Sequence, residues 1–267
     1  MKLICFFILC SMAVACTRNA VTGKSQLLLV PESEMQSMAA KQYKDFLDSS
    51  KVVNSSVKDA EMVRRVGQRI TASITNYYKE QGKANILDGF QWDYNLVESN
   101  EVNAWCMPGG KIVVYTGILP ITQNEAALAV VMGHEITHAL AKHGSERMSQ
   151  GLVQQFGQVA LSVALASKSQ QTQALFMNAY GVGSNLGVIL PFSRNQEYEA
   201  DQFGLNWAAM AGYNPQEAIP LWERMEKAGG GNRPPEFLST HPSEGNRITR
   251  LQKQMPEALK YYKPMNR

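Results

Sequence analysis

The chain has 267 residues, of which 45% are hydrophobic, so it can bury a core the size of one medium domain. Its formal net charge at pH 7 is only +3 and it contains no block of basic residues, which argues against nucleic acid as a partner. Composition therefore favours a globular protein over a nucleic-acid-binding or a fibrous one.

The first fifteen residues are typical of a secretory signal peptide. Lys2 gives a positive start, and residues 3–14 are almost wholly apolar, uncharged and too short to span a membrane. The run ends in "AVAC", where small residues lead to Cys16 as in a bacterial lipoprotein signal. We expect lipidation of Cys16; the alternative is an ordinary signal peptide with a chance cysteine. Residues 16–31 are polar at first and are expected to form the lipidated tether.

The rest of the chain, residues 32–267, predicts a single α+β domain that is mainly α. Between residues 90 and 115 "FQWDYNLV" alternates, "PGG" marks a turn and "KIVVYTG" is rich in β-branched residues, which indicates a hairpin or small sheet. Helical spacing or composition predicts helices over 32–48, 58–80, 126–141, 146–166 and 197–211, and a last one that "THPSEGNRITRLQKQ" opens.

The helix predicted over 126–141 carries a candidate metal site. His134 and His138 are four residues apart, so both imidazoles lie on one helix face and can bind one metal ion, with Glu135 between them. The surrounding residues are apolar, and buried ionisable groups need a partner or a metal. Gly144 fits the end of this helix, and His143 is expected only to interact favourably with the helix dipole.

A catalytic zinc site needs a third protein ligand. A histidine six residues after His138 would mark one class of zinc protease, but Gly144 stands there, so that class is excluded. Carboxylates cluster in "SRNQEYEADQFGL", where Glu197 and Asp201 share a face with small residues that could pack closely on the metal helix. We choose Glu197 as the ligand and expect Asp201 to accept the free ring N–H of a ligating histidine.

Glu199 lies about 160° around the same helix from Asp201, so we expect it to point away from the site.

Together, "HEITH" and "SRNQEYEAD" resemble metallopeptidase family 48, the relatives of the CAAX prenyl protease. "NAWCMPGGKIVVYTG", "THPSEGNR" and "NAVTGKSQ" are similar to that family as well, and the last one resembles its bacterial lipoprotein branch. The resemblance implies a zincin-type metalloprotease fold, one zinc ion per chain and Glu197 as a zinc ligand. It does not extend to prenyl substrates, because the chain lacks the spanning helices of the prenyl protease.

In this interpretation Glu135 is the general base that takes a proton from the zinc-bound water. The resemblance places His241 close to the metal, either as a latch on the open position or as a donor to the oxyanion; the alternative is a residue that caps a turn. Arg247 belongs to the same motif and could contact the oxyanion or be a solvated helix arginine.

Substrate binding is expected along Asn103, Gly109 and Gly110. An extended peptide can add to an exposed sheet edge as a further strand, which reads backbone more than side chains. Asn103 could bond the backbone of the peptide, and the two glycines would allow a close approach. Selectivity would then be broad.

The sequence therefore predicts an exported zinc endopeptidase, periplasmic and anchored by lipid to the cell envelope, with the outer membrane as the expected location. Its substrates would be unfolded or misassembled envelope polypeptides. A second hypothesis is a lipoprotein chaperone or assembly factor that binds clients with little cleavage. A third is a structural zinc site with His241 as fourth ligand. Glu135 favours the enzyme, because binding zinc does not require it.

Overall fold

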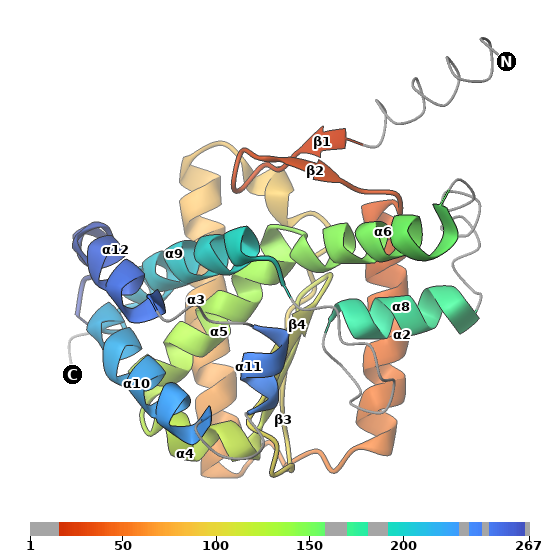
Figure 1. Cartoon of the computed structure of the whole chain (residues 1–267). Helices are drawn as coiled ribbons and strands as arrows, with labels where there is room; N and C mark the ends of the chain where they lie inside the picture. Colours follow the sequence, from red (N-terminus) through yellow and green to blue (C-terminus); the bar gives the residue numbers. More distant parts are fainter. Residues whose placement is uncertain (1–15, 158–169, 181–191, 230–234, 242–245, 265–267) are drawn as a thin grey trace, which may run out of the picture.

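A computed structural model of the chain describes residues 16–157, 170–180, 192–229, 235–241 and 246–264 (Figure 1). The strands are β1 Cys16–Arg18, β2 Ser25–Leu27, β3 Asp93–Val97, β4 Ala104–Met107 and β5 Lys111–Tyr115. The helices are α2 Glu32–Ser49, α3 Lys58–Glu80, α4 Leu119–Thr122, α5 Glu125–Leu140, α6 His143–Phe156, α8 Gln170–Ala179, α9 Arg194–Met210, α10 Ala218–Gly229, α11 Glu236–Thr240 and α12 Arg247–Tyr261, with single 3-10 turns at Ala84–Leu87, Thr116–Ile118 and Pro215–Glu217.

The mainly helical α+β class is confirmed, and so is the small sheet before the metal helix. That sheet has the strand order β3-β5-β4, in which β5 runs parallel to β3 and antiparallel to β4. The β4–β5 hairpin turns at Gly109 and Gly110, whose φ angles of 76° and 83° favour glycine. The expected signal peptide, residues 1–15, and most of the second half of the helix predicted over 146–166 lie outside the described residues.

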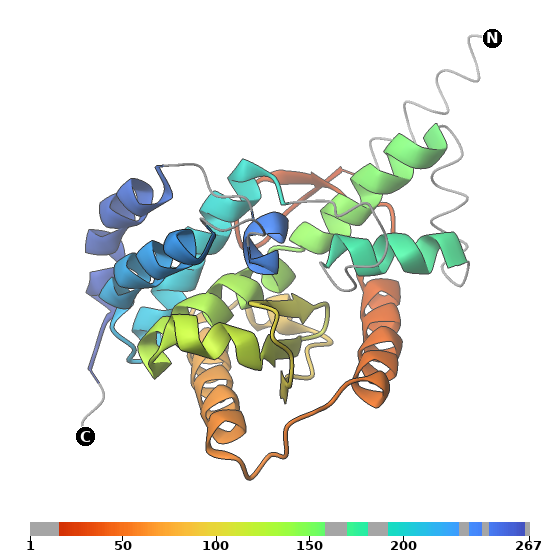
Figure 2. The same ribbon diagram turned by 60° about the horizontal axis from the view of Figure 1, so that its bottom comes forward.

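The sheet separates two hydrophobic cores. Leu96, Cys106 and Ile112 face the larger core with α3, α5, α9, α10 and α12, whereas Trp105 and Val113 face a smaller core with α2, α6 and α8. The alternation follows from the period of two along a strand. Figure 2 shows the sheet between α2, with α8 near it, on one side and α5 on the other.

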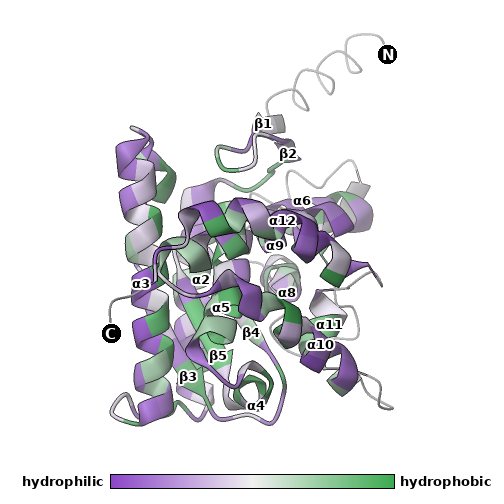
Figure 3. Cartoon of the chain, turned by 90° about the vertical axis from the view of Figure 1, so that its left-hand side faces the viewer, coloured by the Kyte–Doolittle hydropathy of each residue, from purple (hydrophilic) through white to green (hydrophobic). Residues whose placement is uncertain are grey.

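Helix α5 runs through the larger core, and every residue from Ala127 to Leu140 is buried. It is largely green in the hydropathy colours of Figure 3, whereas α3 at the rim shows both colours. The α3 helix buries one apolar stripe that includes Val63, Val66 and Ile70. A buried helix segment keeps ionisable residues only where partners meet them, and between Ala127 and Leu140 those residues are the motif His134, Glu135 and His138.

Candidate metal centre

Two glycines let α5 and α9 touch backbone to backbone. A Cβ atom on Gly133 would lie 2.7 Å from the carbonyl oxygen of Gly204, and a Cβ on Gly204 would lie 2.7 Å from the nitrogen of His134. The crossing brings Glu197 and Asp201, which precede Gly204 on α9, against the metal helix. The close packing expected for this face of α9 is thus present.

The start of α9 is fixed by a capping box. Ser193 Oγ accepts a hydrogen bond from the backbone N–H of Gln196, and the amide oxygen of Gln196 accepts one from the backbone N–H of Ser193. Glu197 follows directly, in the first turn of the helix. Its position relative to α5 therefore depends on both the cap and the glycine crossing.

The structure brings four donor residues together: His134, His138, Glu197 and His241, all buried, with ligand atoms within 4.8 Å of one another. Nε2 of His134 lies 3.1 Å from Nε2 of His138 and 3.2 Å from Nδ1 of His241. Glu197 Oε1 lies 3.4 Å from His138 Nε2 and 3.0 Å from His241 Nδ1, and Glu197 Oε2 lies 3.4 Å from His134 Nε2.

These spacings fit a single tetrahedral metal ion. Two ligand atoms at zinc-bond length on a tetrahedral ion are about 3.3 Å apart. The nitrogens and the carboxylate also form a donor set that suits zinc. In addition, Glu197 Oε2 and Glu135 Oε1 are buried and accept no hydrogen bond from any described residue, as expected for oxygens that face an ion or a water.

Burial and neighbouring charges shift the pKa values of all four residues of the cluster. Burial lowers the pKa of His138 well below its usual value and that of His241 to about 4, so both rings are neutral. Burial opposes a charge on Glu197, but His241 and His134 outweigh it and hold the pKa of Glu197 well below its usual value. Burial also opposes a charge on His134, yet Glu197 and Asp201 raise the pKa of His134 to about 9. Metal binding at the cluster must therefore release a proton from His134.

Glu135 stands beside the cluster. Its Oε1 lies 3.4 Å from Nε2 of His241. Burial, opposed by the neighbouring His134, raises the pKa of Glu135 to about 8. A carboxylate whose pKa lies near neutrality is suited to accept and return a proton.

His134 is held by a carboxylate that is itself held by an arginine. Its Nδ1 lies 3.1 Å from Asp201 Oδ1, and Arg247 Nη2 donates to the same oxygen at 2.6 Å. Arg247 is fully buried, and its guanidinium carbon lies 3.4 Å from the centroid of the Trp222 ring. The solvated arginine considered from the sequence is therefore wrong. Arg247 contacts Asp201 and, at 3.3 Å, Glu197.

His138 is held differently. Its Nδ1 lies 3.0 Å from Nδ1 of His143, and Nε2 of His143 lies 2.9 Å from Glu199 Oε2. Glu199 also forms an ion pair with Lys24. Burial opposes its charge, but the hydrogen bonds from His143 and Lys24 lower the pKa of Glu199.

The expectation that His143 only interacts with the helix dipole was wrong, because its ring bonds to His138 and Glu199. His143 follows the end of α5 closely but is the first residue of α6, and Lys142 with φ 53° separates the two helices. Glu199 does lie on another face of α9 than Asp201, but α6 and the N-terminal segment cover that face and bury it. Gly144 does not end α5, which stops at Leu140, but lies in the first turn of α6.

Two aromatic rings pack against the imidazoles of His138 and His241. The ring of Phe192 lies 3.8 Å from that of His138 and 4.9 Å from that of His241, measured between centroids. Phe237, on α11, lies 4.5 Å from His241. His241 directly follows α11, so the position of that short helix determines where its imidazole lies. The turn-capping alternative does not account for its contacts with Glu197 and His134.

Of the three residues expected to bind substrate, Asn103 lies at one end of β4 and the two glycines lie at the other. Asn103 is buried just before β4, and its side-chain oxygen accepts a hydrogen bond from the N–H of Ala104. Nearby, the N–H of Phe237 on α11 donates to the carbonyl of Val102. Gly109 and Gly110 lie at the other end of β4, and the nearest atoms to them belong to Gln36, Gly89 and Trp92. Gln36, Gly89 and Trp92 do not belong to the metal cluster. The geometry therefore gives the two glycines a turn-forming role.

Residues 16–31 also differ from the tether expected from the sequence. They contain the antiparallel strands β1 and β2, which we call the N-terminal hairpin, residues 16–27. Asn19 and Gln26 of this hairpin both donate to the carbonyl of Ala141, at 2.8 Å and 2.7 Å. The hairpin therefore packs on the end of the metal helix. Its motif "NAVTGKSQ" was the available sequence signal.

Among the described residues, no helix combines the length and the apolar composition needed to cross a membrane.

The sequence of the chain is similar to the sequences of several known proteins. The chain is 30% identical over 255 residues to the mitochondrial metalloendopeptidase OMA1 of Bos taurus, which is 93% of this chain and 47% of that protein. It is 37% identical over 189 residues to mitochondrial metalloendopeptidase OMA1 of Arabidopsis thaliana, 69% of this chain and 36% of that protein. It is 30% identical over 158 residues to the beta-barrel assembly-enhancing protease of Escherichia coli, 57% of this chain and 32% of that protein.

This chain thus spans about half or less of the length of these relatives. The family model of peptidase family M48 matches residues 60–255, which include all four residues of the metal cluster, Glu135 and both carboxylates that hold its histidines. The chain belongs to peptidase family M48.

Proposed function

We propose that the chain is a zinc-dependent endopeptidase that hydrolyses peptide bonds in unfolded or misassembled polypeptides. One observation carries the proposal: a buried cluster of three imidazoles and one carboxylate with a further carboxylate, Glu135, beside it. A structural zinc site would use the four ligands and would give Glu135 no role. Metalloendopeptidase relatives support the same reaction.

In this proposal His134, His138 and Glu197 hold one zinc ion per chain. Zinc at this position supplies a Lewis acid that polarises a peptide carbonyl and activates water. Glu135 takes a proton from the attacking water and returns it to the leaving amine, for which its raised pKa is suited. Asp201 and Arg247 keep the His134 ring in the tautomer that presents Nε2 to the metal.

His241 acts as a latch on the fourth corner of the site. The support is its Nδ1, which lies 3.2 Å from His134 Nε2 and 3.0 Å from Glu197 Oε1, at the same spacing as the other ligand atoms. A latched site must open before a substrate enters, so only a fraction of molecules is competent. His241→Ala should raise casein cleavage about tenfold or more, if the open state is a minor one. A fall in kcat would instead assign His241 to oxyanion stabilisation.

The substrate enters where α11 now lies. Strand β4 is at the edge of its sheet, and the bond from Phe237 N–H to Val102 O attaches α11 to the chain just before β4. If α11 moves with His241, an extended peptide can pair with β4 next to the metal. Asn103, at the start of β4, is the residue placed to contact the peptide backbone.

The cell envelope is the proposed location. The supporting features are the signal-like residues 1–15, the cysteine at position 16 and the E. coli relative named as a beta-barrel assembly-enhancing protease. Residues 32–267 then form one protease domain, lipid-anchored through Cys16, most simply to the outer membrane. Labelled palmitate should enter the chain in a bacterial host and should not enter a Cys16→Ala variant. Equal labelling of both would contradict lipidation at Cys16.

The test of the reaction compares Glu135→Gln with the unaltered chain. Glutamine keeps the shape of the side chain and removes the proton acceptor, so zinc content should stay near one per chain while casein cleavage falls by about 10²–10⁴. A metal chelator should abolish the cleavage by the unaltered chain. Casein cleavage at full rate by Glu135→Gln would disprove the mechanism. Client binding without cleavage by the zinc-loaded unaltered chain would favour the chaperone hypothesis.

A further inference from the structure

The N-terminal hairpin is attached to the metal centre by a continuous series of side chains. Lys24, in the turn of the hairpin, pairs with Glu199 Oε1, Glu199 Oε2 lies 2.9 Å from Nε2 of His143, and Nδ1 of His143 lies 3.0 Å from Nδ1 of His138. The series runs from a lysine whose side chain is 55% exposed to a histidine that is 1% exposed.

Once His138 binds a metal ion through Nε2, the donor and the acceptor of each hydrogen bond in this series can be assigned in only one way. His138 must keep Nε2 free for a metal ion, so its Nδ1 carries the proton and donates to Nδ1 of His143. Because Nδ1 of His143 accepts this bond, Nε2 of His143 carries a proton and donates to Glu199. Lys24 donates to the other oxygen of that carboxylate. Each group thereby fixes the tautomer or the orientation of the next.

A second set of bonds holds the hairpin to the end of the metal helix. Asn19 and Gln26 donate to the carbonyl of Ala141, the residue that ends α5. Gln26 also donates to Glu146 Oε2 at 3.3 Å, and Gln196 of α9 donates to the same oxygen at 2.8 Å. The hairpin therefore bonds to the three helices that surround His138.

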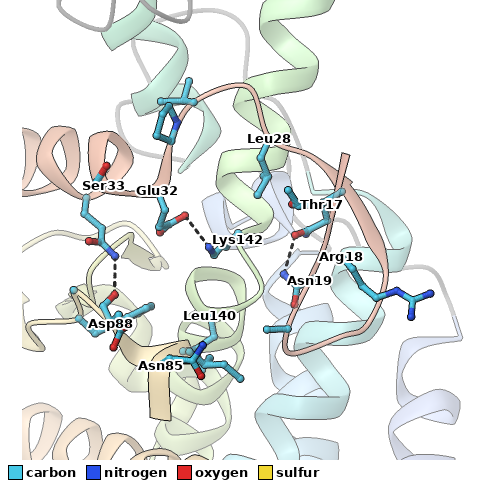
Figure 4. A pocket seen from close by; sticks show the side chains of 18 of the residues that line it. Thr17, Arg18, Asn19, Leu28, Glu32, Ser33, Asn85, Asp88, Leu140 and Lys142 are labelled. Atoms are coloured by element: carbon cyan, nitrogen blue, oxygen red, sulfur yellow. Dashed lines mark hydrogen bonds and ion pairs between the residues drawn. The ribbon is translucent and has the colours of Figure 1, made fainter. Parts of the chain in front are cut away.

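A cavity borders the hairpin. A cavity of about 730 Å³ lies between the hairpin and the start of α2, with Arg18, Leu28 and Asn85 among its lining residues and the Glu32–Lys142 pair at 3.5 Å across it (Figure 4). No residue of the metal cluster lines this cavity. Asn19 and Gln26, which bond to Ala141, also line this cavity.

We propose that the N-terminal hairpin positions the metal ligand His138 through Lys24, Glu199 and His143, so that the segment next to Cys16 controls the metal affinity of the site. The inference rests on the proposed zinc site. Lys24, Glu199 and His143 are positioning residues, since none of them reaches the ligand atoms of the cluster. A displacement of the hairpin breaks the contact at Lys24 first and leaves the ring of His138 less well oriented.

The test is the zinc dissociation constant, measured by competition with a chromophoric chelator on the full chain. Lys24→Met should weaken zinc binding about threefold, the effect of one exposed ion pair, and Lys24→Arg should restore it. Lys51→Met is the matched control, because Lys51 pairs with Glu98 on the surface away from the cluster, and its zinc affinity should not change. Lys24 is exposed enough that the unfolding temperature of the chelator-treated variant should equal that of the unaltered chain.

A double variant shows whether Lys24 acts through Glu199. In the Glu199→Gln background, Lys24→Met should have no further effect on zinc affinity, because the series is already interrupted. Zinc affinity of Lys24→Met equal to that of the unaltered chain overturns the inference, and so does an equal loss in both backgrounds. Failure of the unaltered chain to bind zinc would overturn the proposed function itself, which separates the two results.

Discussion

The two metal-binding histidines of α5 are supported in different ways. His134 donates directly to Asp201, which is neutralised by the fully buried Arg247 from α12. The Nδ1 of His138 instead donates to a second imidazole, His143, which in turn donates to Glu199. One support is wholly internal, whereas the other extends to the molecular surface.

The difference indicates which support contributes to the stability of the fold and which one contributes to metal affinity. Removing one partner of a buried ion pair leaves an uncompensated charge, which costs far more than the loss of an exposed pair. The His134 side is therefore expected to be coupled to folding. The His138 side is expected to influence metal affinity with little effect on the fold.

The largest effect is expected on the His134 side. Asp201→Ala leaves the guanidinium of Arg247 buried without its main partner and should lower the free energy of unfolding by about 3–5 kcal/mol. Urea denaturation of chelator-treated protein measures this without a contribution from metal. Asp45→Ala, which removes an exposed carboxylate paired with Lys41, is the control and should change little. A loss no larger than that of the control would remove the contrast between the two sides.

The glycine crossing is expected to affect both sides together, because α9 carries both supporting carboxylates. Gly204→Ala places a methyl group 2.7 Å from the backbone nitrogen of His134, so the helices must separate. We expect a loss of about 1–3 kcal/mol in unfolding free energy, as for other overpacked cores. Zinc affinity should fall as well, since Glu197 moves with α9. Unchanged stability and zinc affinity would mean that the crossing does not position the site.

On the His138 side, Glu199→Gln should weaken zinc binding about tenfold, at the low end for a group that orients a metal ligand. The amide can still accept a hydrogen bond from His143, but it no longer carries the charge that pairs with Lys24. Denaturation of the metal-free protein should change much less than for Asp201→Ala. The contrast between the two sides would be contradicted if Glu199→Gln lowered the free energy of unfolding by more than it lowered the free energy of zinc binding.

The smallest effect is expected at the beginning of α5, which does not distinguish the two sides. Asn124 caps this helix by accepting a hydrogen bond from the N–H of Ala127 at 2.8 Å. Asn124→Ala should cost about 1 kcal/mol of unfolding free energy. The ratio of zinc affinities between Glu199→Gln and Asp201→Asn should be the same with and without this change. A shift in that ratio would indicate that the cap acts on one histidine alone.

The sequence predicted the parts of the site that depend on a single helix. The spacing of His134 and His138 and the face shared by Glu197, Asp201 and Gly204 are properties of helical periodicity, which local sequence determines. The structure places these residues together as expected. The sheet before the metal helix was also predictable, because its strands alternate and its turn contains two glycines.

The His138 support could not be predicted in the same way. It depends on a left-handed residue, Lys142, at which no local signal requires a break, and on a hairpin more than a hundred residues earlier in the chain. Only one face of α9 was expected to be functional, so Glu199 on another face was not chosen. In the structure, α6 and the N-terminal hairpin bury that second face. The polar composition of residues 16–31 predicts a tether and does not reveal that Asn19 and Gln26 bond to Ala141.

The most direct test of the central claim is X-ray absorption on the zinc-loaded chain, which counts the imidazoles bound to the metal. The proposed centre predicts one zinc per chain with three imidazole ligands at about 2.0–2.1 Å and one carboxylate oxygen. His241→Ala should retain zinc with two imidazoles and gain an oxygen ligand. Two imidazoles in both proteins would contradict the latch, and a chain that binds no zinc would contradict the metal centre.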